Sequence, residues 1–136
     1  MKIGNAKGMT YVEILIATLL FILAIVSLLN SLTAIVYFIS LSGEQTLAIS
    51  DLRNMMEQIK VTAFANMVGL FPNSVIDGPT GNYYQAVVGG YTLNNEHIVV
   101  TYRNTNTDPL EIRLSLTWQD RRNHNQNLAI STFKTR

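Results

Sequence analysis

A single acidic residue, Glu13, stands at the start of a long apolar stretch and is the first candidate for chemistry. A carboxylate inside a lipid bilayer is costly, so an acid at that depth is a candidate functional group that needs a charged partner. The charge pattern is equally consistent with an acid at the headgroup boundary that is solvated from the cytoplasm. The residues alone leave both interpretations open.

The residue types that usually carry catalysis or bind metals are few and scattered. The chain has no cysteine and two histidines, His97 and His124, for which we expect a structural or solvated role. It contains no Gly-x-Ser-x-Gly, Gly-x-x-x-x-Gly-Lys or His-Glu-x-x-His motif. Asp77, Asp108 and Asp120 lie in loops with asparagines nearby, which suits an exposed calcium site, although turn-forming aspartates are the commoner explanation. We expect no enzymatic activity, no catalytic residue, no cofactor and no metal.

A basic group near the C-terminus is a weak candidate for an anion or DNA site. It comprises Arg121, Arg122, Lys134 and Arg136. If the last strand lies beside the preceding loop, these charges form one patch that could meet phosphates. The alternative is an ordinary solvated edge that discourages strand-to-strand aggregation. We favour the second, because aromatic residues do not interleave these charges and a net charge of +1 attracts no nucleic acid over distance.

The element that positions Glu13 is a predicted membrane-spanning helix. A chain of 136 residues has room for one small domain, or one domain plus a membrane segment. Residues 14–43 carry no charge, and 14–38 exceeds the roughly 20 apolar residues that cross a bilayer core. Lys2 and Lys7 place the N-terminus in the cytoplasm by the positive-inside rule. The apolar run is too long for a cleaved secretory signal, and a plain signal anchor does not explain Glu13.

After Gly43 the pattern predicts an amphipathic helix and a small antiparallel sheet, so the fold class is α+β. Apolar residues recur at spacings of three and four over 44–67, and the helix should end near Gly69. Period-two strands follow at 98–103 and 110–118, a final strand spans 128–133, and either 83–88 or 91–93 is a candidate first strand. We interpret Met55, Met56 and Met67 as core residues. The predicted apolar stripe comprises Ile49, Leu52, Met56, Ile59 and Ala63.

The N-terminus resembles the class III signal of type IV pilins and type II secretion pseudopilins. A short leader with two lysines ends in Gly8, and Met9-Thr10-Tyr11-Val12-Glu13 leads into the apolar run. In that family a prepilin peptidase cuts after the glycine, the new N-terminal residue is methylated, and a glutamate is fifth in the mature chain. The resemblance therefore implies cleavage between Gly8 and Met9, N-methylation of Met9 and an assembly role for Glu13.

The implied cut gives Glu13 a partner. It exposes an α-amino group on Met9 that is largely cationic at neutral pH. In a filament, the carboxylate of an incoming subunit can neutralise the ammonium group of a neighbour, or its own, within the apolar helix bundle. Because an unpaired charge in a low dielectric is strongly unfavourable, the pair would specify the axial register.

The resemblance also implies a pilin-like architecture: a cleaved leader at 1–8, a membrane and filament-core helix at 9–42, and a head at 43–136. Met9 replaces the usual phenylalanine, the helix lacks the mid-segment proline and glycine of major pilins, and no cysteine pair brackets a C-terminal loop. Methionine is a tolerated variant at the cleavage site, so processing is still expected. The other two departures favour a minor pilin or pseudopilin over a major pilin.

We therefore expect a subunit that assembles through its helix into a type IV pilus or a type II secretion pseudopilus, near its tip. Its expected partners are other pilins, the prepilin peptidase, the inner-membrane assembly platform and, before assembly, membrane lipid. Its expected location is the bacterial inner membrane, as a single pass, and then a periplasmic or extracellular filament. The alternatives are an uncleaved single-span periplasmic binding or sensor module, and a DNA-binding competence pilin.

Overall fold

The computed structural model describes residues 10–103 and 108–135 and divides the chain into two compact units, Met1–Ser40 and Leu41–Arg136. The helix α1, Tyr11–Val61, contributes its N-terminal part to the first unit and its C-terminal part to the second. It runs without interruption through Gly43, the one glycine within it.

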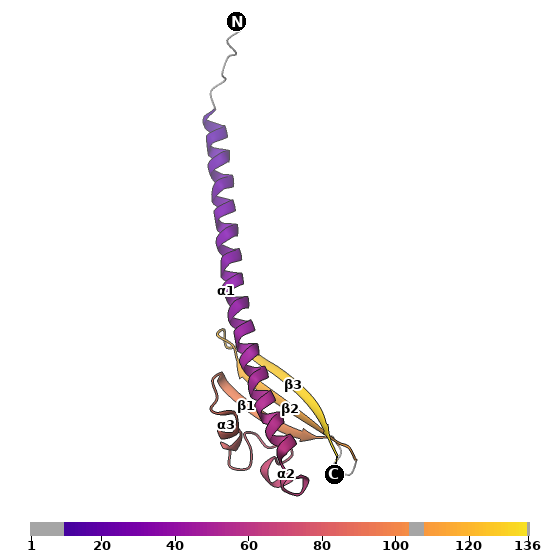
Figure 1. Cartoon of the computed structure of the whole chain (residues 1–136). Coiled ribbons are helices and arrows are strands. Elements are labelled where there is room, and N and C mark those ends of the chain that lie inside the picture. The colour runs from indigo at the N-terminus through magenta and orange to yellow at the C-terminus, as the bar shows by residue number, and fades with distance from the viewer. Residues whose placement is uncertain (1–9, 104–107, 136) are drawn as a thin grey trace. The chain divides into compact units, whose positions relative to one another are not determined.

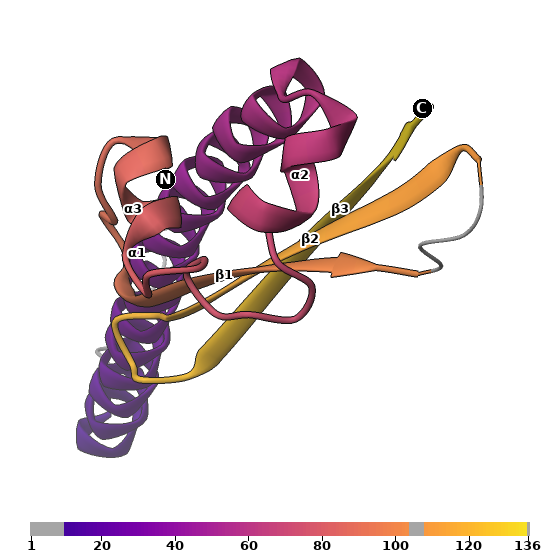
Figure 2. The same ribbon diagram turned by 90° about the horizontal axis from the view of Figure 1, so that it is seen from below.

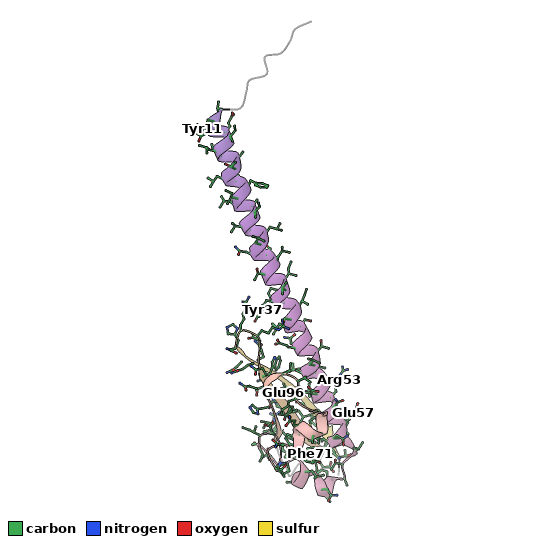
Figure 3. All side chains as sticks on the ribbon, turned by 90° about the vertical axis from the view of Figure 1, so that its left-hand side faces the viewer. Tyr11, Tyr37, Arg53, Glu57, Phe71 and Glu96 are labelled. Atoms are coloured by element: carbon green, nitrogen blue, oxygen red, sulfur yellow. The ribbon has the colours of Figure 1, made fainter. Side chains whose placement is uncertain are left out.

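The described part of the first unit is a helix whose large apolar side chains are exposed, with one exception. From Tyr11 to Ile39 they keep between 41% and 76% of their accessible surface, apart from the half-buried Tyr37. Apolar side chains project from every side of the helix (Figure 3). By its length and composition, α1 is able to cross a membrane.

The second unit is α+β, as the period-two and helical patterns predicted. The C-terminal part of α1 packs on an antiparallel sheet of three strands within the described residues, in the order β1-β2-β3 (Figure 1). The strands are β1 (Asn94–Tyr102), β2 (Leu110–Gln119) and β3 (Asn125–Lys134). Alternate strand residues, such as Ile98 and Leu114, are fully buried against α1. Met55, Met56 and Met67 are core residues, which confirms their interpretation.

Two short helices complete the core on the same side of the sheet as α1 (Figure 2): α2, Phe64–Leu70, and α3, Tyr83–Val88. Phe71, which follows α2, stacks on Tyr84 of α3 with ring centroids 5.9 Å apart. Both side chains are buried, so these rings close one end of the core.

The predicted single helix ending near Gly69 is wrong in one respect, because α1 ends at Val61 and α2 is separate. Ala63 lies between them with an extended backbone, φ −60° and ψ 141°. The predicted stripe is also corrected, because Ile49 and Ala63 are exposed whereas Ala48 and Met55 are fully buried.

The predicted first strand is also wrong, because residues 83–88 form α3 and residues 91–93 lie outside the strands. Gly89, with a φ of 90°, ends α3 in the left-handed conformation that favours glycine. The segment beside β1 is instead 73–77. Ser74 N donates to Val100 O at 2.8 Å and Asp77 N donates to Ile98 O at 2.9 Å, so this segment covers one edge of the sheet.

Candidate functional site

The candidate assembly residue Glu13 lies in the first turn of α1, where it forms a reciprocal cap with Thr10. The backbone N–H and the hydroxyl of Thr10 donate to Glu13 Oε2 at 2.7 and 2.9 Å. In return, Glu13 N donates to Thr10 Oγ1 at 3.3 Å. This is a capping box, which satisfies backbone N–H groups that have no partner inside the helix.

The capping role of Glu13 goes beyond the charge-pairing role predicted from the sequence. The signal was visible, because Thr10 and Glu13 have the Thr-x-x-Glu spacing that opens many helices. Both hydrogen bonds from Thr10 use Oε2, and Oε1 accepts none from the described residues. Glu13 is exposed. It can therefore cap its own helix through one oxygen and present the other to a cationic group.

The remaining residues of this candidate site, Gly8 and Met9, lie outside the described residues. Thr10, the first described residue, is the N-cap of α1, and the helix begins at Tyr11. The carboxylate of Glu13 therefore bonds to the residue directly after Met9, close in the chain to the α-amino group that the implied cut would create.

The turn at Asp77 is organised by its buried carboxylate. Oδ1 accepts from the Tyr91 hydroxyl at 2.6 Å and from Ile98 N at 3.0 Å, and Oδ2 lies 2.7 Å from His97 Nδ1. Burial of Tyr91 and the hydrogen bond from its hydroxyl to Asp77 raise the pKa of Tyr91. Asp77 itself has a φ of 58°. It joins a turn to β1, which agrees with the turn-forming interpretation of Asp77 and the structural one of His97.

Asp120 organises the turn between β2 and β3 in a similar way. Its Oδ1 accepts from Arg122 N at 2.8 Å and from His124 N at 2.9 Å, and its Oδ2 accepts from Gln126 Nε2 at 3.2 Å. Asp108 lies apart from both turns, exposed and next to Pro109. In the described parts of the chain, no three acidic, histidine or cysteine side chains gather in a group able to hold a metal ion.

The described residues of the predicted basic patch do not lie together. Arg121 and Arg122 lie in the turn before β3, whereas Lys134 is the last residue of that ten-residue strand. Lys134 Nζ donates to the carbonyl oxygens of Ile59 at 2.8 Å and Lys60 at 3.1 Å, and to that of Thr62. The ammonium group of Lys134 is thus hydrogen-bonded at the end of α1. Arg136 lies outside the described residues.

Comparison of the chain with protein-family models, with curated proteins and with solved structures finds no match.

Proposed function

We propose that this chain is a minor pilin or pseudopilin that assembles through its apolar N-terminal helix into a type IV pilus or a type II secretion pseudopilus. The observation that carries the proposal is the position of Glu13. It is the fifth residue after Gly8 and the third residue of α1, directly before an apolar helical segment with exposed side chains. In this proposal, the helix lies in the inner membrane with its N-terminus in the cytoplasm before assembly.

Exposure of the helix supports an assembling role over that of a soluble core helix. Burial of apolar side chains away from water is favourable, and the exposed apolar side chains of this helix do not gain that free energy while they remain in water. The segment therefore needs lipid or other apolar helices around it. Lipid meets this need before assembly, and neighbouring subunits meet it in a filament. The prepilin peptidase and the assembly platform of the inner membrane are the proposed partners for the transfer.

The capping box gives Glu13 a second task in this mechanism. Oε2 remains with Thr10 and fixes the start of the helix, while Oε1 can accept from the Met9 ammonium group of the same or a neighbouring subunit. A carboxylate already oriented by its own helix loses less conformational entropy on pairing. The pair then sets the axial position of each subunit.

Two substitutions separate the cap from the charge. Glu13→Gln keeps the capping hydrogen bonds, because glutamine also serves at this position of a capping box, but it cannot neutralise an ammonium group. Glu13→Ala removes both. If charge pairing drives assembly, both variants should enter filaments roughly tenfold or more below the wild type in a competition assay. Glu57→Gln, which changes an exposed glutamate in the second unit, is the matched control and should assemble normally.

Wild-type incorporation of Glu13→Gln would overturn the charge-pairing mechanism and leave only the cap. The identity of the protein is tested separately, by N-terminal sequencing and intact mass of the chain from native membranes. The proposal expects a chain that begins at N-methylated Met9, and Gly8→Val should prevent this processing. An intact chain beginning at Met1 in cells with an active prepilin peptidase would instead indicate an uncleaved single-span binding or sensor module.

A further inference from the structure

Two carboxyl groups face each other inside the second unit, between α1 and β1. Asp51 of α1 is 8% exposed and Glu96 of β1 is 3% exposed. Each carboxyl group lies within hydrogen-bonding reach of the other. Figure 3 shows Glu96 within the head, whereas the neighbouring charged residues of α1, Arg53 and Glu57, lie on the opposite, exposed side of the helix.

The hydrogen bonds of Glu96 leave one oxygen for Asp51. Oε2 accepts from the backbone N–H groups of Thr92 and Leu93 at 3.1 and 3.0 Å. Oε1 is buried and has no hydrogen-bond partner among the described residues. Two ionised carboxylates are both acceptors only, so a hydrogen bond between them requires a proton on one.

No cation compensates this pair within the described chain. The groups that act on it are Asp51 from α1, Glu96 from β1, and Tyr91 from the segment before β1. Tyr91 is neutral, and its hydroxyl donates to Asp77 instead. Burial raises the pKa of both carboxyl groups, and the negative charge of Asp51 raises that of Glu96 further. Asp51 is the more exposed of the two, so it is the better place for the remaining charge.

We propose that Asp51 and Glu96 share one proton, carried by Glu96 Oε1 and donated to Asp51, and that this proton fastens α1 to β1 in a pH-sensitive way. When the proton is present, the contact is a charge-assisted hydrogen bond in a buried setting. When it is lost, two like charges oppose each other in a buried setting where no cation of the described chain compensates them. The helix that carries the apolar segment is then held less tightly to its sheet.

The direction of the pH dependence follows from linkage. In the unfolded chain, a glutamate releases its proton near its ordinary pKa of about 4.3. In the folded chain, the proton is retained to higher pH, so the folded state binds more protons and loses stability as pH rises. Between the two pKa values, the folded-to-unfolded ratio should fall by up to tenfold for each pH unit.

The test is denaturant unfolding of the full chain in detergent micelles between about pH 5 and about pH 9, a range above the ordinary pKa of a carboxyl group. Trp118, the one tryptophan of the chain, is buried in the second unit and reports on it by fluorescence. Glu96→Gln places an amide N–H where the shared proton lies, and Asp51→Asn does the same from the other side. Relative to either variant, the wild type should lose stability as pH rises, whereas Glu57→Gln should behave like the wild type.

A parallel fall in stability in the wild type, Glu96→Gln and Asp51→Asn would overturn the proposal. Carbon NMR of carboxyl-labelled wild-type protein provides a test that does not depend on the variants folding. The proposal expects one aspartate or glutamate carboxyl to ionise at a pH above its ordinary pKa, with a titration step that is absent from Glu96→Gln or Asp51→Asn. A titration in which no carboxyl group ionises above its ordinary pKa would contradict it.

Discussion

Two tyrosines in the core differ in whether their hydroxyl group has a hydrogen-bond partner. The Tyr102 hydroxyl donates to Phe71 O at 2.6 Å, and burial raises the pKa of this group to about 12, so it remains a donor at ordinary pH. The Tyr84 hydroxyl is buried without a partner among the described residues. The two rings therefore contribute in a similar way to packing, whereas only the hydroxyl of Tyr102 stabilises the fold.

This difference predicts opposite outcomes for one substitution. Tyr102→Phe should lower the free energy of unfolding by about 0.5–1.5 kcal/mol, because it removes a satisfied hydrogen bond and leaves the carbonyl of Phe71 without a donor. Tyr84→Phe should leave stability unchanged or raise it, because it removes a buried polar group that has no partner. Denaturant unfolding followed by Trp118 fluorescence measures both. An equal loss in the two variants would show that the Tyr84 hydroxyl is satisfied after all.

At the scale of elements, Lys134 joins the end of the last strand to the end of the longest helix. Its ammonium group donates to the carbonyl oxygens of Ile59 and Lys60 in the last turn of α1, where carbonyl groups lack partners within the helix, and to that of Thr62 just after the helix. A positive charge at this position also interacts favourably with the helix dipole. The contact stabilises the end of α1 at Val61, where the chain has no glycine or proline.

Lys134→Met should therefore destabilise the second unit by about 1.5–3 kcal/mol, the range for hydrogen bonds to a charged group. Methionine keeps most of the aliphatic length of lysine and removes its donors. Lys60→Met, in the exposed last turn of α1, is the matched control and should change stability by no more than about 0.5 kcal/mol. Similar losses in the two variants would mean that the charge near the helix end matters and the carbonyl contacts do not. Chemical denaturation of the full chain in detergent distinguishes these results.

The contact of Lys134 with the end of α1 could not be predicted from the sequence. Periodicity located the strands and the long helix because each has a repeated pattern of its own. It did not locate the break after Val61, since the group that stabilises the break is more than 70 residues away. The segment 83–88 has aromatic and β-branched residues typical of a strand, yet it forms α3 because Tyr84 packs on Phe71 and Gly89 ends the helix.

The candidate site was predictable to a similar degree. The position of Glu13 in the chain and its apolar context were visible in the sequence, and so was the spacing that makes it a cap. The pairing of Asp51 with Glu96 was not visible, because it depends on which face of α1 meets β1. One residue along an amphipathic helix changes that face by about 100°, which the pattern of apolar residues does not determine closely enough.

At the scale of the whole molecule, the two units differ in whether their large apolar side chains are buried or exposed. The second unit has one core of buried apolar residues between α1 and the sheet. The described part of the first unit exposes nearly all of its large apolar residues, on a segment long enough to cross a bilayer. A water-soluble protein rarely carries an exposed apolar surface of this extent, so the first unit is built for an apolar environment.

The environment can be tested by placing charge on that segment. Ile25→Lys combined with Leu29→Lys puts two ammonium groups one turn apart near the middle of the apolar segment. Each costs about 2.5–3.5 kcal/mol at the centre of a bilayer, so the pair should greatly reduce the fraction that stays with membranes after alkaline extraction. Asn54→Lys with Gln58→Lys adds the same charges at exposed positions of α1 in the second unit, and this control should remain in the membrane. Equal retention of both double variants would mean that residues 25–29 do not lie in the hydrocarbon core, and the helix would then need a protein partner to cover it.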